Sequence, residues 1–226
     1  MTWVLDNVDL ILALSVEHLR QCAIAIVLAF VVALPLGTLA WRFRIFRDSI
    51  ITFTSLLYTI PSIALLVLLP TALGLPLISD VNLIVALIIY GVALLVRAVA
   101  EGLDAVDPDV RLAAVAMGYG SARRFVFVDL PLAGPVILAG LRVTAVSTIA
   151  LATVGAIIGR TNLGYLFTNG YQRRIVEEIF SGIVAVVVLA LLVDLLLVVL
   201  GRFALPWARR SAGAGTRIVV QTGGAA

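Results

Sequence analysis

Few residues of this 226-residue chain have side chains suited to covalent or metal chemistry. The single histidine, His18, has no companions with which to complete a metal site, and we expect it at a surface or an interface. The single cysteine, Cys22, cannot form a disulfide within the chain and fits a small buried hydrophobe. All sixteen basic residues are arginines, so the chain lacks the lysine with which a P-loop holds nucleotide phosphates. These counts argue against an enzyme, a metal site or a nucleotide site of the usual kind.

Five further residues lie inside long apolar runs, where they are candidates for lining or gating a transport pathway. Pro61 and Ser62 mark a kink within a helix, which either lines and gates a pathway or only shapes packing. Tyr58 and Tyr90 lie near mid-depth, where an aromatic face attracts a quaternary ammonium group but also suits a helix interface. Asp194 interrupts the last run, and a carboxylate there is a candidate for transport unless an ion pair or a watery crevice satisfies it.

Three glycines, Gly155, Gly159 and Gly164, occur around the end of the fourth apolar run. Glycine permits close helix approach and tight turns, so we expect these residues mainly to serve packing. Residues 161–171 beside them are a candidate outer gate of a transport pathway, and Gly159 is a candidate residue of that pathway or gate.

A segment of different character, residues 102–131, separates the third and fourth apolar runs. Asp107 suits the cap of a helix, Pro108 its first position, and Gly118 its end. One face of this predicted helix is apolar and mostly small, although the helix lies outside the bilayer, so something must cover it: the chain's own bundle or a cleft on a partner. That face consists of Val110, Ala113, Ala114 and Met117.

The elements that position these residues are predicted to be membrane spans. Hydrophobic residues make up 62% of the chain, charged residues 13%, and the mean hydropathy is +1.17. Charge-free runs such as 21–41 and 49–79 exceed the roughly 20 residues that cross a bilayer. We therefore predict an all-α integral membrane protein with spans at about 20–41, 49–73, 82–100, 133–158 and 179–201. An N-terminal interfacial helix (1–17), a transmembrane domain (18–205) and a disordered cytoplasmic tail (206–226) complete the expected organisation.

The arginines give an expected orientation. Twelve of the sixteen flank the first, third and fifth spans on one side, and Arg20, Arg160, Arg173 and Arg174 lie on the other. The positive-inside rule then places the N-terminus outside and the C-terminus in the cytoplasm. The same rule explains the net charge of +3 without a nucleic-acid partner.

Residues 102–131 resemble the coupling loop of binding-protein-dependent ABC importer permeases. The family pattern is Glu-Ala-Ala, three residues, Gly, and later Leu-Pro; here Ala113, Ala114, Gly118, Leu130 and Pro131 match it. The resemblance implies a type I ABC importer permease fold, in which this short helix docks into the ATPase subunit. Leu112 replaces the motif's Glu, and its neighbour Arg111 is not an evident substitute. One hypothesis is that this chain pairs with a second, non-identical permease that keeps the Glu.

Colinear segments over roughly 15–175 resemble the osmoprotectant branch of this family, whose members import glycine betaine, choline, carnitine and related solutes. These segments include 58–62 (YTIPS), 106–108 (VDP), 130–137 (LPLAGPVI), 139–142 (AGLR) and 155–159 (GAIIG). The implied solute is a compatible solute of this kind, with another small zwitterion or an amino acid as the alternative.

The resemblance also implies partners and a mechanism. A second permease chain, identical or not, forms the pathway with this one in the inner membrane. Cytoplasmic ABC ATPase subunits carry ATP and Mg²⁺, an extracytoplasmic binding protein delivers the solute, and this chain binds no cofactor. The rival classes are a gradient-driven secondary transporter or channel, a membrane-embedded enzyme and a non-transport structural subunit; a solitary intramembrane charge, Asp194, and the exposed helix at 108–118 weigh against them.

Overall fold

The computed structural model describes residues 2–207, and all their regular elements are helices. Within this range four helical stretches are long and apolar enough to cross a membrane, and a bent helix pair makes a fifth span if it counts as one. The predicted all-α class with about five spans is therefore confirmed. The predicted tail beyond residue 207 lies outside the described residues.

The long stretches are α2 (Val8–Arg42), α5 (Asp80–Asp104), the run Ser121–Ile158 and α10 (Val176–Ala204). The run Ser121–Ile158 consists of α7 (Ser121–Arg124), a π-helical turn (Phe125–Asp129), α8 (Leu130–Ala152) and a 3-10 segment (Thr153–Ile158). The remaining helices are α1 (Thr2–Asp6), α3 (Arg44–Thr59), α4 (Ser62–Leu73), α6 (Pro108–Ala116) and α9 (Gly164–Arg173).

Helix α5 forms the centre of the bundle and packs against α2, α3, α4 and α8. Its Leu95, Val96 and Val99 are fully buried. Small residues bring the neighbouring helices close: a Cβ on Gly91 would lie 2.7 Å from the Cβ of Ala29, and one on Gly140 2.3 Å from that of Ala98. Close backbone approach is the usual basis of helix association in a bilayer, where apolar burial between helices gains little.

The predicted boundary between an interfacial helix and the first span is not a break in the helix. Helix α1 ends at Asp6, and α2 then runs without interruption from Val8 to Arg42. Asp9 and Glu17 are ordinary helix-compatible residues, and Asp9 lies in the first turn, where a carboxylate is favourable. The polarity of residues 8–17 therefore lowers their hydropathy without ending the helix.

The predicted second span, 49–73, consists of two helices and not one kinked helix. Helices α3 and α4 meet at Ile60 and Pro61 with an angle of 106°. Ile60 is extended (φ −65°, ψ 127°), as a residue before proline prefers to be. The chain thus turns sharply here instead of crossing straight.

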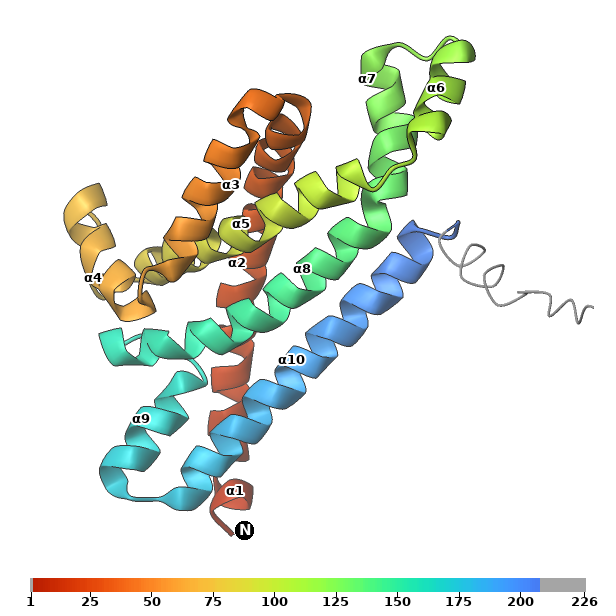
Figure 1. The fold of residues 1–226 in the computed structure, drawn as a ribbon. Coiled ribbons are helices and arrows are strands. Elements are labelled where there is room, and N and C mark those ends of the chain that lie inside the picture. The colour runs from red at the N-terminus through yellow and green to blue at the C-terminus, as the bar shows by residue number, and fades with distance from the viewer. Residues whose placement is uncertain (1, 208–226) are drawn as a thin grey trace, which may run out of the picture.

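The two ends of the molecule differ (Figure 1). Helices α6 and α7 project from one end, close to where α10 finishes, whereas the N-terminus and α9 lie at the other. We call these the α6 end and the α9 end.

Candidate functional site

Helix α6 is the short helix predicted between the third and fourth spans. The Asp107 carboxylate accepts a hydrogen bond from the Asp109 backbone N–H at 2.8 Å, and Pro108 occupies the first helical position. The helix ends at Ala116, and Gly118 adopts φ = +83°, a left-handed conformation that favours glycine. The predicted start and end of this helix are confirmed.

Apolar side chains cover most of the exposed surface of α6. Met117 is 71% exposed, Leu112 66%, Val115 51% and Val110 41%, and Ala113 is exposed beside them. Leu112 occupies the position of the family's Glu, so this departure adds an apolar side chain to the same surface. An apolar helix that projects from the bundle needs a partner to cover it.

Ala114 does not belong to that exposed surface, because it is 1% exposed. It lies at the edge of the predicted face, where a side chain of one carbon lets α6 approach the chain's own α7 and π-helical turn. Leu130 and Pro131 also lie elsewhere: they begin α8, and Leu130 packs against the core cluster that contains Val99 and Leu103. The exposed part of the predicted set is therefore Val110, Ala113, Met117 and Gly118.

A buried carboxylate that sequence reasoning missed anchors α6 to the bundle. Asp129 is 0% exposed and accepts hydrogen bonds from Arg111 at 2.8 Å and Arg124 at 3.2 Å. Arg111 also donates to the Leu103 carbonyl and stacks over the Trp41 ring at 5.1 Å. Arg111 thus points inward and does not take the place of the family's Glu on the exposed surface of α6. The available signal was an isolated acid in the apolar run FVFVDLP.

The turn between α3 and α4 brings together Tyr58, Pro61, Ser62 and Tyr90. The Tyr90 hydroxyl donates to the Ile60 carbonyl at 2.5 Å, so it satisfies a backbone acceptor at the break between α3 and α4. Tyr90 is 4% exposed, which makes it a structural support of the turn. Tyr58, 42% exposed, packs edge-on against Tyr90 with ring centroids 5.7 Å apart. Of these two candidate cation contacts, only Tyr58 presents a ring to the outside.

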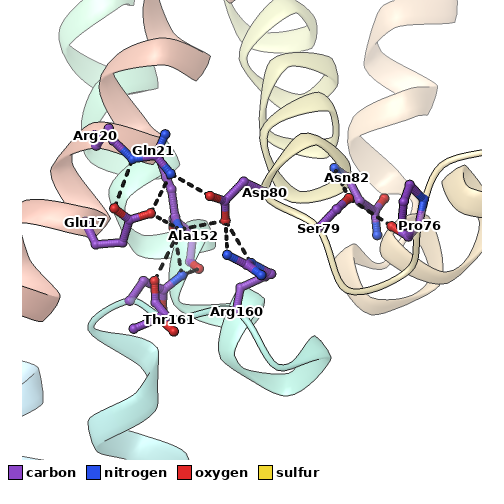
Figure 2. Close-up of polar contacts among 11 residues, drawn as sticks. Glu17, Arg20, Gln21, Pro76, Ser79, Asp80, Asn82, Ala152, Arg160 and Thr161 are labelled. Atoms are coloured by element: carbon purple, nitrogen blue, oxygen red, sulfur yellow. Dashed lines mark hydrogen bonds and ion pairs between the residues drawn. The ribbon is translucent and has the colours of Figure 1, made fainter.

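A polar cluster around Asp80 ties three elements together near the α9 end (Figure 2). The Asp80 carboxylate at the start of α5 accepts from Arg20 of α2 at 2.5 Å and from Arg160 at 2.6 Å. Gln21, which is fully buried, donates to Asp80 at 3.3 Å and to the Thr161 carbonyl at 3.2 Å. The cluster holds the segment after α8 against α2 and α5.

Asn162 extends this cluster into the turn that begins α9. Its side chain donates to Gln21 at 3.1 Å and to the Ala152 carbonyl at 2.8 Å, and accepts from the Gly164 N–H at 2.9 Å. Gly159 makes the preceding turn at φ = +79°, a left-handed conformation in which a residue with a side chain would strain the backbone. Residues 161–171, the predicted gate, are therefore firmly attached at their N-terminal side.

Asp194 pairs with Arg142 between α10 and α8. Both carboxylate oxygens accept from the guanidinium, from Nε and Nη2, each at 2.7 Å. Arg142 lies in the middle of α8, and therefore inside the predicted fourth span. The last span therefore contains a paired charge, and Asp194 is not the solitary intramembrane charge that the sequence indicated.

His18 is buried, contrary to the expected surface position, and one ring nitrogen lies 3.0 Å from the Ile149 carbonyl. Within residues 2–207 no three His, Cys, Asp or Glu side chains gather in a way that could hold a metal ion. The sites of interest are thus the α6 surface, the α3–α4 turn, the Asp80 cluster and the Arg142–Asp194 pair.

Comparisons with known proteins define the class. Residues 25–210 match the family described as the binding-protein-dependent transport system inner membrane component. The chain is 34% identical to the glycine betaine/carnitine/choline transport system permease of Bacillus subtilis, over 91% of this chain and 94% of that one. It is 31% identical to the osmoprotectant import permease of Salmonella typhimurium, over 86% and 92%.

Its fold is similar to that of a solved inward-facing methionine ABC transporter, with a TM-score of 0.79 and 21% identity over 88% of this chain and 98% of the other. The chain belongs to the family of binding-protein-dependent permeases and is an inner-membrane protein with the type I ABC importer fold.

Proposed function

We propose that this chain is the channel-forming subunit of an ATP-driven importer for a compatible solute such as glycine betaine, choline or carnitine. The observation that carries the proposal is the match, over most of the chain, to permeases whose names specify these solutes. Another small zwitterion or an amino acid is the alternative cargo within the same class.

In this proposal ATP and Mg²⁺ bind to separate ATPase subunits, and the chain itself catalyses no reaction. The α6 end faces the cytoplasm, where the exposed apolar surface of α6 inserts into a groove of the ATPase. Arginines at the end of α2, the start of α3 and in α6 and α7 support this orientation by the positive-inside rule: Arg42, Arg44, Arg47, Arg111, Arg123 and Arg124. A second permease chain completes the pathway, and a binding protein delivers the solute at the α9 end.

Transport then follows from two states of the permease pair. Closure of the ATPases on ATP moves both α6 helices and favours the outward-facing state; hydrolysis allows return to the inward-facing state. The permease is a two-state element whose equilibrium is shifted by ligands on both faces.

The test is reconstitution of the chain in proteoliposomes with its ATPase and binding proteins, with uptake of radiolabelled glycine betaine, choline and carnitine as the measurement. We expect uptake to require ATP. The variant Met117→Asp should reduce uptake at least about tenfold, because burying an unpaired carboxylate in an apolar groove costs several kcal/mol. Met117→Leu is the matched control and should leave uptake close to the wild-type rate. Uptake by the chain alone, driven by an ion gradient, would instead support a secondary transporter.

A further inference from the structure

The ion pair between Arg142 and Asp194 lies within the apolar part of the chain. Arg142 follows the start of α8 by about 18 Å, and Asp194 precedes the end of α10 by about 15 Å, at 1.5 Å per residue. Both residues therefore fall well inside stretches that are long and apolar enough to span a membrane.

This pair is not sealed within the bundle. The side chain of Arg142 is 40% exposed and that of Asp194 26% exposed. Arg142, to which Asp194 is bonded, borders a groove of about 250 Å³ between α8 and α10, lined also by Pro135, Leu138, Val198, Gly201, Arg202 and Leu205. Charged groups at membrane depth almost always face a bundle interior or a water-filled cavity, since contact with hydrocarbon is costly. A half-exposed pair on the outside of one chain thus indicates water at this face in the assembled transporter.

The Arg142–Asp194 pair also differs from the two other carboxylate centres in its number of partners. Asp129 has two arginine partners and Asp80 has two arginines and a glutamine. Among the described residues Asp194 accepts hydrogen bonds from Arg142 alone. A carboxylate held by one neighbour can exchange that neighbour for a ligand without dismantling a network.

We propose that the Arg142–Asp194 pair faces the translocation pathway and opens to receive a zwitterionic solute. The solute's carboxylate takes the place of Asp194 on the guanidinium, and its cationic nitrogen lies beside the Asp194 carboxylate. This inference rests on the proposed function, because it takes the cargo to be a small zwitterion.

Such an exchange of partners suits a site that the solute occupies only briefly while it crosses the membrane. One ion pair is replaced by two contacts between opposite charges, so no charge is left unpaired and the net binding free energy stays small. A quaternary ammonium has no N–H, so its contact with Asp194 is purely electrostatic. Conduction requires binding that is favourable enough for entry and weak enough for exit.

The first test is the double variant Arg142→Met with Asp194→Leu in the reconstituted transporter. A pair with only a structural role can be replaced by apolar residues with little loss. We expect glycine betaine uptake to fall at least tenfold, while assembly with the ATPase and basal ATP hydrolysis remain at wild-type levels. Wild-type uptake by this variant would overturn the inference and leave the proposed function intact. Absence of uptake of glycine betaine, choline and carnitine alike by the wild-type transporter would contradict the proposed function itself.

The second test shows whether water and solute reach the groove, and it does not depend on assembly of the double variant. Cys22, the only cysteine, is buried, so a Cys22→Ala background allows single cysteines to be introduced. In this background Val198→Cys, at the groove, should react with a membrane-impermeant thiol reagent, and saturating glycine betaine should slow the reaction at least threefold. Leu196→Cys is the matched control: it lies on the same helix, is 55% exposed and does not line the groove, so we expect it to face lipid and not to react. No reaction at Val198→Cys, or reaction without protection by glycine betaine, would overturn the inference.

Discussion

The α6 end and the α9 end of this chain differ in the contacts that their functional residues make. At the α9 end, the Asp80 cluster pairs its charges within the chain and ties α2, α5 and the turn before α9 together. At the α6 end, one buried carboxylate, Asp129, holds the base of the projecting segment, and the surface beyond it is apolar and uncovered.

The difference shows which region is stabilised by contacts within the chain and which region needs contacts with another molecule. A satisfied polar cluster stabilises its own region without another molecule. An exposed apolar helix is stabilised only when another molecule removes it from water. The α6 end is therefore the end at which we expect assembly to change stability most.

The largest expected effect is at Asp129. Asp129→Asn leaves Arg111 and Arg124 without their carboxylate, and we expect unfolding to become easier by about 3 kcal/mol, because removing one partner of a buried ion pair leaves an uncompensated charge. Denaturant titration of the purified chain measures this change, and binding of the ATPase should weaken in parallel. The control Glu101→Gln breaks an ion pair whose side chains are both more than half exposed and should cost less than about 1 kcal/mol. Equal effects of the two changes would show that Asp129 is not the anchor of this end.

An intermediate effect is expected at the other end, from Asp80→Asn. The substitution removes the charged acceptor shared by Arg20, Gln21 and Arg160, and bonds to charged groups contribute roughly 1.5–3 kcal/mol. We expect a loss of about 2 kcal/mol in the same titration, with ATPase binding unchanged because α6 is far from the substitution. Asp9→Asn, at an exposed position, should change stability by less than about 0.5 kcal/mol. A loss of ATPase binding in Asp80→Asn would contradict the independence of the two ends.

The smallest effect is expected at the turn between α3 and α4. Tyr90→Phe removes only the hydroxyl that donates to the Ile60 carbonyl, and we expect a cost of about 1 kcal/mol from that lost hydrogen bond. The thermal unfolding midpoint of the purified chain checks it. Tyr58→Phe keeps the ring contact with Tyr90 and serves as the control. If Tyr58→Phe is as destabilising as Tyr90→Phe, the hydroxyl of Tyr90 is not what supports the turn.

Local patterns predicted the local structure well. The cap at Asp107, the proline after it and the glycine at 118 were enough to place α6, because each residue acts on its own backbone. Long charge-free runs likewise predicted the spans, since the thickness of the bilayer sets their length. At Pro61 the sequence indicated a bend but not its size, because the angle depends on how α3 and α4 pack against α5.

Contacts between distant residues were not predictable from one sequence. Asp194 is separated from Arg142 by 52 positions and Asp80 from Arg160 by 80, so nothing in their neighbourhoods indicated a partner. Ala114 shows the same limit on a smaller scale. Helical periodicity placed it near Val110 and Met117, but the approach of α7 decided which side chains stay exposed.

Helix α8 has a mechanical consequence. Its 23 residues make a rod about 35 Å long, which begins just after Asp129 and ends at Ala152, whose carbonyl accepts a hydrogen bond from Asn162. A tilt of about 9° at the first end displaces the far end by about 5 Å, nearly the rise of one helical turn. A small push on the motor side would thus arrive at the opposite surface as a shift large enough to exchange one set of side-chain contacts for another.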